Sequence, residues 1–484
     1  MGTTSQRGDD ASPRVPVEAL QAAVGAGPGN AAGPGNAAAP APAGGAAAAA
    51  TRLRQPAGAA RPNPAAASHG SLSTAKAPPF RLPGEHFTAA MLFLLLGAAG
   101  VFVVAPDLTL GMYPSPRVVA VTHLFTLGWI TTSIMGALYQ FLPVALGQPV
   151  RSVRLGHATF ALYVPGLLAF VGGFLSGHKD LMLLGAAAFG TGILLFAGNL
   201  GATLARAKRR DVTWWALAAA DVFLVITLIF GIALAGNLRW GYLGAHRLTA
   251  LATHLHIALA GWVLLVVFGV ARRLLPMFLL SHGAGERWLK AAVALVAAGA
   301  GVLAVFHHMA PPLSRWLPAA LIASGLVCFL VQARRFYTHR HRPQLDPGMR
   351  LAATGLVFLA AALGLAVPVL AGSASPRLAT AYVMDIVLGL SLFVAAHYYK
   401  IVPFLVWYHR FGPLAGKQPV PRVSELYSTG LASAAAALLA AGAAVLVVSV
   451  AVGSATFARA GALVFATGVS AEAFQMLRLA RRQP

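Results

Sequence analysis

Long apolar segments separated by short polar turns repeat along the chain from His86 onward. Each has the length of about 20 residues that an α-helix needs to cross a bilayer. The segments cover residues 86–106, 118–146, 157–177, 181–205, 213–236, 247–276, 289–309, 316–336, 350–371, 378–406, 428–451 and 456–478. The pattern predicts an all-α, polytopic membrane bundle of 12 transmembrane helices within residues 85–480.

The segment before the bundle has a different composition. Residues 1–80 consist largely of Ala, Gly and Pro, as in "AGPGNAAGPGNAAAPAPAGGAAAAA", with scattered arginines and almost no bulky apolar side chain. Such a segment cannot bury enough apolar surface to fold, so we expect a disordered cytoplasmic tail. No apolar run follows its first basic residues, which argues against a signal peptide.

Composition supports a membrane protein. Hydrophobic residues make up 58% of the 484 residues and charged residues only 10%, against about 25% charged residues in soluble proteins. The formal net charge is +23. In a polytopic protein, basic residues set the topology and meet anionic lipid headgroups. We therefore expect the lipid bilayer as partner, and no nucleic acid.

The basic residues also predict the topology. If residue 1 is cytoplasmic, 29 of the 36 Lys and Arg residues lie on the inner side of the twelve spans and 7 on the outer side. This bias is typical of cytoplasmic loops. It predicts a multi-pass protein of the cell inner (cytoplasmic) membrane with its N- and C-termini in the cytoplasm.

The second and sixth spans share a sequence pattern. Counted from His123 in one and His256 in the other, both have Gly at +5, Trp at +6, Gly at +13 and Pro at +20. The tenth span aligns with them on Pro403, and then has Val383 where they have histidine. Equivalent spans four apart predict a pseudo-threefold arrangement of three four-helix units.

Several ionisable residues lie in the outer half of the expected membrane core. Such residues are costly there and usually functional, and imidazole is a common ligand of copper and haem iron. A single cysteine, Cys328, excludes metal sites built from several cysteines. The candidates are His123, His254, His256, His307, His308 and Asp385.

We expect His256, His307 and His308 to bind one metal ion. The pair His307–His308 precedes a proline pair, which cannot continue a helix, so both imidazoles could turn toward His256. Asp385 is expected to act as a further ligand or to accept a hydrogen bond from a ligating imidazole. The alternatives are interfacial histidines bonded to water and headgroups, and a solvated Asp385 paired with Arg377.

These elements resemble subunit I of the haem–copper oxidase superfamily, notably its C-type oxidases and nitric oxide reductases, over about residues 85–480. "HIALAGWVLLVVFGVARRLLP" followed by "FHHMAPPLSRWLP" matches the family's histidine on the sixth span and His-His pair on the seventh. The resemblance implies copper bound by His256, His307 and His308, and places His123 at a low-spin haem ligand. The alternative for His123 is a packing role.

A second resemblance concerns His254. The order His-x-His, Gly, Gly and Pro in the sixth span ("THLH" onward) is similar to that of the nitric-oxide-response membrane proteins called NnrS, another haem and copper family. It implies His254 as a second cofactor ligand; a hydrogen bond to Thr249 or to the backbone is the alternative. No Cys-x-x-Cys-His motif exists, so the haem expected is of the b type.

The tenth span departs from the oxidase family. The two haem-binding histidines of the family's tenth span align with Ala381 and Val383. The usual two-haem centre therefore cannot form, and no catalytic residue is assigned.

The resemblances imply a haem/copper-type redox protein, an oxidoreductase that handles a diatomic gas and receives electrons from a cytochrome or another donor subunit. The alternative is a non-catalytic copper or haem carrier, sensor or assembly factor on the same scaffold. A secondary transporter is less favoured, because the repeat is threefold rather than twofold.

Overall fold

The structure, a computed structural model, describes residues 78–310 and 313–484. These residues form helices and no β-strand, and twelve of the helical segments are long and apolar enough to cross a membrane. The expected all-α bundle of twelve spans is confirmed. The expected tail over residues 1–80 lies outside the described residues except for its last three.

The first four spans form unit 1. Its second span is interrupted by a π-helical segment, η2. The elements are α2 (Arg81–Thr109), α3 (Pro116–His123), η2 (Leu124–Thr131), α4 (Thr132–Leu146), α5 (Val153–Ser176) and α6 (Lys179–Ala205).

Unit 2 has the same order, and its second span again contains a π-helical segment, η4. The elements are α7 (Val212–Trp240), α8 (Arg247–His256), η4 (Ile257–Leu264), α9 (Leu265–Leu279), α10 (Arg287–Phe306) and α11 (Trp316–Thr338).

Unit 3 lacks a π-helical segment at the corresponding place. Its second span, α13, is a regular α-helix up to Val406, and the π-helical turn η5 follows only at its end. The elements are α12 (Pro347–Ala371), α13 (Pro376–Val406), η5 (Trp407–Phe411), α14 (Thr429–Val452) and α15 (Ala455–Ala480).

Local sequence sets most of these helix ends. Ser115, Ser152, Asp211, Asp346 and Ser375 each accept a hydrogen bond from a backbone N–H in the first turn of the helix that follows. Glycines with positive φ end other helices; they are Gly147, Gly177, Gly241, Gly372 and Gly453.

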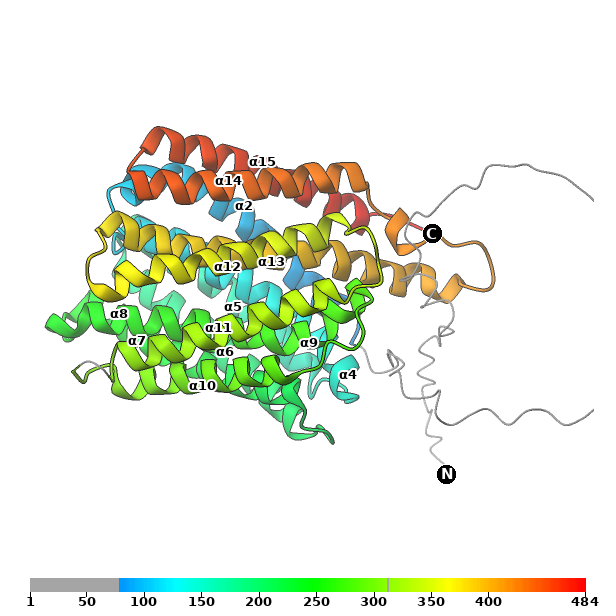
Figure 1. Ribbon diagram of the computed structural model, residues 1–484, viewed down its shortest axis with the longest axis horizontal. Coiled ribbons are helices and arrows are strands. Elements are labelled where there is room, and N and C mark those ends of the chain that lie inside the picture. The colour runs from blue at the N-terminus through cyan, green and yellow to red at the C-terminus, as the bar shows by residue number, and fades with distance from the viewer. Residues whose placement is uncertain (1–77, 311–312) are drawn as a thin grey trace, which may run out of the picture.

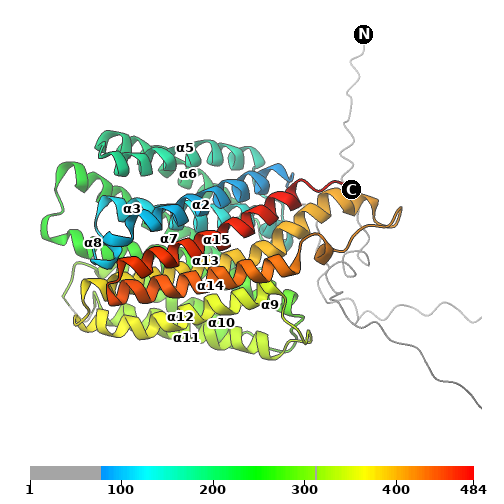
Figure 2. The same cartoon turned by 90° about the horizontal axis from the view of Figure 1, so that it is seen from above.

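The helices run along the long axis of the bundle (Figures 1 and 2). Each unit packs against the next and the third against the first, so that the three units close into a ring: α6 packs against α7, α11 against α12 and α15 against α2. The second span of each unit lies inside the ring. These three spans are the most buried of the twelve, with 72%, 72% and 61% of their most apolar windows inside the protein.

The same glycine contact recurs in every unit. At one position of each second span, an added Cβ would come within 2.6–2.8 Å of a phenylalanine on the first span, so only glycine fits there. The pairs are Gly128 with Phe93, Gly261 with Phe223, and Gly389 with Phe358. This repeated contact fixes the register of the pseudo-threefold arrangement.

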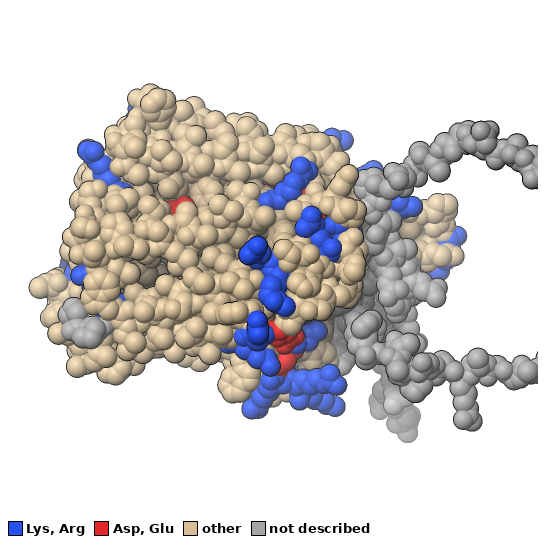
Figure 3. Space-filling model, in the orientation of Figure 1, with Lys and Arg blue, Asp and Glu red and all other residues tan. Residues whose placement is uncertain are grey.

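The two ends of the bundle differ in charge. Most Lys and Arg side chains of the described residues gather at the end where the C-terminus lies (Figure 3). We call this the basic end; it comprises residues 147–152, 206–211, 280–286, 339–346, 415–428 and 481–484. The other end, which includes residues 110–115 and 307–310, is called the opposite end. That the basic end faces the cytoplasm stays a prediction.

Candidate functional site

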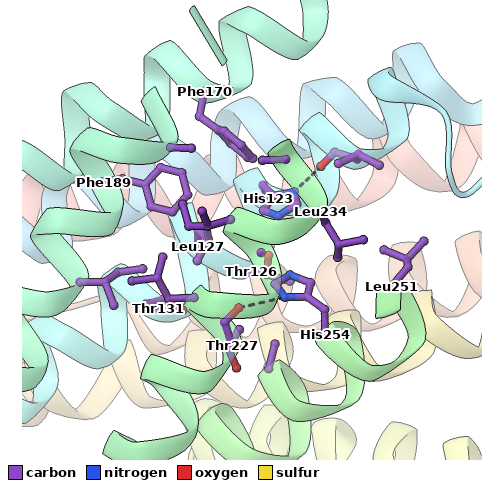
Figure 4. Close-up of a pocket in the computed structure, with 18 of the residues that line it drawn as sticks. His123, Thr126, Leu127, Thr131, Phe170, Phe189, Thr227, Leu234, Leu251 and His254 are labelled. Carbon is purple, nitrogen blue, oxygen red and sulfur yellow. Dashed lines mark hydrogen bonds between the residues drawn. The ribbon is translucent and has the colours of Figure 1, made fainter. Parts of the chain in front are cut away.

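A cavity of about 150 Å³ lies between units 1 and 2, and two of the predicted histidines, His123 and His254, line it (Figure 4). It reaches from Pro114 and Arg247 at the opposite end down to Trp262. Its other walls are almost entirely apolar. A cavity of this size and character can hold a small molecule in a dry environment.

His123 is the last residue of α3, directly before the π-helical segment η2. Its ring meets Phe170 of α5 edge-on, with 5.2 Å between ring centroids. Its Nδ1 lies 2.8 Å from the carbonyl oxygen of Val119. A carbonyl can only accept, so Nδ1 donates and carries the proton. In the neutral imidazole, Nε2 therefore keeps its lone pair.

His254 approaches the same cavity from α8, in unit 2. Its Nδ1 donates to the carbonyl oxygen of Thr227 on α7 at 3.1 Å, so its Nε2 also keeps its lone pair. Gly231 makes room for the ring, because an added Cβ there would lie 3.1 Å from Cε1 of the imidazole. The imidazoles of His123 and His254 thus line the same cavity from two neighbouring units.

His256 points to the interface between units 2 and 3. Its Nδ1 donates to the carbonyl oxygen of Ala252 at 2.8 Å, and its Nε2 lies 3.1 Å from the hydroxyl of Tyr382 on α13. Because Nε2 is the unprotonated nitrogen, the tyrosine donates this hydrogen bond. The two rings lie 6.0 Å apart. His256 and Tyr382 thus form a second polar pair, which joins units 2 and 3.

The structure corrects the alignment of the tenth span. A π-helical segment accommodates one residue more than regular α-helix, and α13 has none where η2 and η4 lie. Gly389 therefore lies 14 residues before Pro403, whereas the equivalent glycines lie 15 residues before their prolines. Counting back from Pro403 placed Ala381 and Val383 at the ligand positions. Counted from Gly389, these positions hold Tyr382 and Met384.

With this register, one geometric rule describes the first two clefts. Positions are counted back from the shared glycine of each unit, which is Gly128, Gly261 or Gly389. The residue five positions before this glycine in one unit faces the residue seven positions before the corresponding glycine in the next unit. His123 and His254 line one cavity, and His256 is hydrogen-bonded to Tyr382. For the cleft between units 3 and 1, the rule predicts Met384 opposite Val121. The rule thus predicts a polar pair at two of the three interfaces between units.

The His-His pair of the seventh span lies at the opposite end. Helix α10 ends at Phe306, with His307 as its C-cap residue and His308 directly after it. His307 donates from Nδ1 to the carbonyl oxygen of Ala304 at 3.1 Å, and its ring packs on Phe230 of α7 at 5.0 Å. His308 is exposed, with its ring 5.2 Å from that of His307. The proline pair after them lies outside the described residues.

The expected three-histidine group is not assembled in this structure. Among residues 78–310 and 313–484, no three His, Cys, Asp or Glu side chains come together in a way that could hold a metal ion. His256 contacts Tyr382, while His307 contacts Phe230. A copper site built from His256, His307 and His308 therefore stays a prediction.

Asp385 lies on α13, three residues after Tyr382, with 3% of its surface exposed. One of its carboxyl oxygens, Oδ2, is buried and has no hydrogen-bond partner. The solvated acid paired with Arg377 that the sequence left open is therefore not what the structure has. Asp385 is a buried carboxyl close along the helix to the His256–Tyr382 pair.

Sequence reasoning missed four residues at these interfaces. Tyr382 and Met384 were hidden by the one-residue shift, which a comparison anchored on the glycine rather than on Pro403 would have found. Gly231 is one of many glycines in apolar helices, and nothing in the sequence distinguishes it. The carbonyl of Thr227 is a backbone group, which no side-chain pattern reveals.

Comparison with known proteins adds no family assignment. No protein-family profile matches this chain, and no curated protein matches it significantly.

Proposed function

We propose that this protein is an integral membrane redox protein of the haem–copper type, in which His123 and His254 bind the redox group. The observation that carries the proposal is the pair of imidazoles from neighbouring units at one apolar cavity, each with Nδ1 fixed by a carbonyl and Nε2 available. Metal-binding histidines characteristically donate their second ring nitrogen in this way, because the bond orients the ring and raises its basicity.

Copper fits the site better than haem. Two neutral imidazoles are suitable copper ligands, and a cavity of about 150 Å³ leaves room for a diatomic ligand beside a single ion. Pockets for larger ligands have volumes of about 300–1,000 Å³. A haem b group between His123 and His254 therefore requires the cavity to widen. A bound copper ion would supply one-electron transfer and a place for nitric oxide or oxygen to bind.

The protein's own residues would orient the ligands and exclude water. The carbonyls of Val119 and Thr227 hold the two rings, and the walls formed by Phe170, Phe189 and neighbouring leucines keep the cavity apolar (Figure 4). The cavity extends toward the opposite end, next to Arg247. We propose that an electron-donor subunit docks at this end.

A non-catalytic carrier or sensor is the second candidate. It is favoured by the third unit, where Tyr382 and Met384 stand at positions that hold histidine in unit 2. With fewer imidazoles at this depth, the protein has fewer ligands for a second redox group. A single bound group without a partner suits storage, delivery or sensing better than multi-electron reduction.

The test is to purify the protein from copper- and iron-replete cells, determine both metals, and record the reduced-minus-oxidised absorption spectrum. Copper without haem bands favours the two-imidazole copper site; haem b bands with iron favour a widened cavity. His123→Ala and His254→Ala should each lose the bound group. His397→Ala is the control, because this buried histidine also donates from Nδ1 to a carbonyl, that of Phe393, but lies on α13 toward the basic end.

Two outcomes would contradict the proposal: a protein without copper and haem, or a group that His123→Ala and His254→Ala both retain. The double variant His307→Ala plus His308→Ala tests the separate three-histidine prediction. Copper that is lost in this variant but kept in His123→Ala would place the metal at the end of α10 instead.

A further inference from the structure

A fully buried acid lies in α15, in the part of the bundle that the proposed redox site does not use. Glu472 has no exposed surface, and neither carboxyl oxygen has a hydrogen-bond partner. It is the only acidic residue of α15 and lies eight residues before the helix end at Ala480. At 1.5 Å per residue, it is about 12 Å from the basic end.

Glu472 must be protonated in this environment. An ionised carboxylate without a cation or hydrogen-bond donor is too costly to bury at membrane depth. The nearest cation along the helix, Arg478, is exposed and lies over the ring of Phe474, which is itself exposed. Among the described residues, no salt bridge involves Glu472. Its two unpartnered oxygens provide hydrogen-bonding sites for buried water.

Two buried phenols, those of Tyr398 and Tyr399, lie on α13, which packs against α15. The side-chain amide of Gln475, three residues after Glu472 on α15, lies 3.4 Å from the Tyr399 hydroxyl, which places this phenol beside the same part of the helix. The other two helices packed against α15 are α14, which has no titratable side chain, and α2. The titratable residues of α2 have other partners: Glu85 pairs with His157 of α5 and with Arg81, His86 donates to the carbonyl of Leu82 and packs on Tyr139, and Asp107 accepts from Ser115.

The two phenols contact different parts of the protein. Tyr398 shares a hydrogen bond of 2.8 Å with Ser133 of α4, in the interior of the ring. The ring of Tyr399 lies 5.6 Å from that of Tyr427, a half-buried residue of the basic end. Burial and the nearby Asp346 carboxylate raise the pKa of Tyr427 to about 12. At neutral pH this phenol is therefore protonated and can both donate and accept.

We propose that Glu472 is a proton-binding site that exchanges its proton with the basic end through Tyr399 and Tyr427. Water molecules on its free oxygens complete the connection. The carboxyl O–H bond breaks as a neighbouring oxygen takes the proton. Each phenol accepts a proton on its oxygen and releases its own, so no charge stays on a tyrosine. Through Tyr398 the same site can deliver protons to Ser133 inside the ring.

Infrared spectroscopy tests this proposal without any bound metal. At pH 7 the wild-type protein should show the C=O stretch of a protonated carboxyl, and Glu472→Gln should lose that band. Asp385→Asn is the matched control, because Asp385 is the other buried acid with an unpartnered oxygen in the same unit. The Glu472 band should remain in it.

The path is tested by hydrogen–deuterium exchange of the same band. Exchange should be slower in Tyr399→Phe than in wild type. It should be unchanged in Tyr163→Phe, whose buried hydroxyl donates to the carbonyl of Leu127 in unit 1, far along the chain from Glu472. Equal exchange rates in both tyrosine variants would overturn the path. A wild-type protein with no C=O band that depends on Glu472 at pH 7 would overturn the site.

A second measurement needs no variant that has to fold. Dicyclohexylcarbodiimide enters membranes and adds a protonated carboxyl group across its C=N bond. Mass analysis of the α15 peptide from treated wild-type protein should show the adduct on Glu472 at pH 7.

Discussion

At the scale of single residues, a hydrogen bond from Nδ1 of a histidine to a backbone carbonyl does not by itself identify a functional histidine. His123, His256 and His397 all donate from Nδ1 to the carbonyl four residues earlier, at 2.7–2.8 Å. This local bond is a general way to satisfy a histidine on a membrane helix. What distinguishes His123 is the place of its Nε2, which shares a cavity with His254 from another unit. Sequence spacing predicted both histidines, but their facing each other depends on packing.

Gly231→Val tests how closely α7 controls His254. An added Cβ already lies 3.1 Å from the imidazole Cε1, and the γ-methyl groups of valine would push the ring out of the cavity. We expect loss of the bound group, measured by metal analysis and absorption spectroscopy. The folding stability should change by less than about 1 kcal/mol, because valine is a better helix former than glycine.

Ile229→Val is the control on the same helix. Ile229 is 62% exposed on the outer surface of α7, so its shortening should leave the bound group in place. A Gly231→Val protein that binds its group as wild type does would show that His254 is not a ligand.

At the scale of elements, the sequence predicted the spans and missed their internal geometry. All twelve helices follow from hydropathy, because lipid requires each crossing segment to be apolar and helical. The π-helical segments after His123 and His256 leave no signal in hydropathy. Each adds one residue between the histidine and the proline of its span. Alignment on Pro403 therefore matches Val383 with His123 and His256, whereas alignment on Gly389 matches Met384 with them. The glycine–phenylalanine contacts give the correct alignment of the three spans, because they are equivalent packing contacts in the three units.

The hairpin of α5 and α6 provides a test of close helix packing. A Cβ added at Gly185 of α6 would lie well inside van der Waals contact of the backbone nitrogen of Phe170, which cannot move away on its own. Gly185→Ala should therefore destabilise the protein by about 1–3 kcal/mol. It should also displace Phe170 from the cavity wall. Thermal denaturation in detergent measures the change.

Gly198→Ala in the same helix is the matched control. No atom lies within 4 Å of a Cβ at Gly198, so this change should leave stability equal or raise it by up to about 1 kcal/mol through helix propensity. If both variants melted at the same temperature, the close approach of α5 and α6 would be wrong.

At the scale of the whole molecule, the sequence predicts the ring of three units. It does not predict which residues of neighbouring units contact each other. Two spans with the same glycine, tryptophan and proline offsets were enough to infer units of four helices. Which histidines meet depends on how one unit is rotated against the next. The rotation in this structure brings His123 and His254 to one cavity and joins His256 to Tyr382. The predicted group of His256, His307 and His308 is not assembled among the described residues, where His256 contacts Tyr382 and His307 contacts Phe230.

Topology is tested with introduced cysteines in a Cys328→Ser background, which leaves no other thiol. Arg209→Cys lies at the basic end and Lys179→Cys at the opposite end, and both positions are exposed. With a membrane-impermeant maleimide on intact cells, we expect labelling of Lys179→Cys alone. Arg209→Cys should react only after permeabilisation. The reverse pattern would place the basic end outside.

The rule that pairs a residue of one unit with a residue of the next has a consequence for assembly. A single unit folded alone holds only half of each pair, so neither pair exists until neighbouring units have docked. A group bound by both His123 and His254 would therefore cross-link units 1 and 2, and its binding free energy would add to the stability of the closed ring. Packing of unit 1 against unit 2 and binding of the cofactor then stabilise each other. In a protein without the cofactor, the interface between units 1 and 2 should be the first to open.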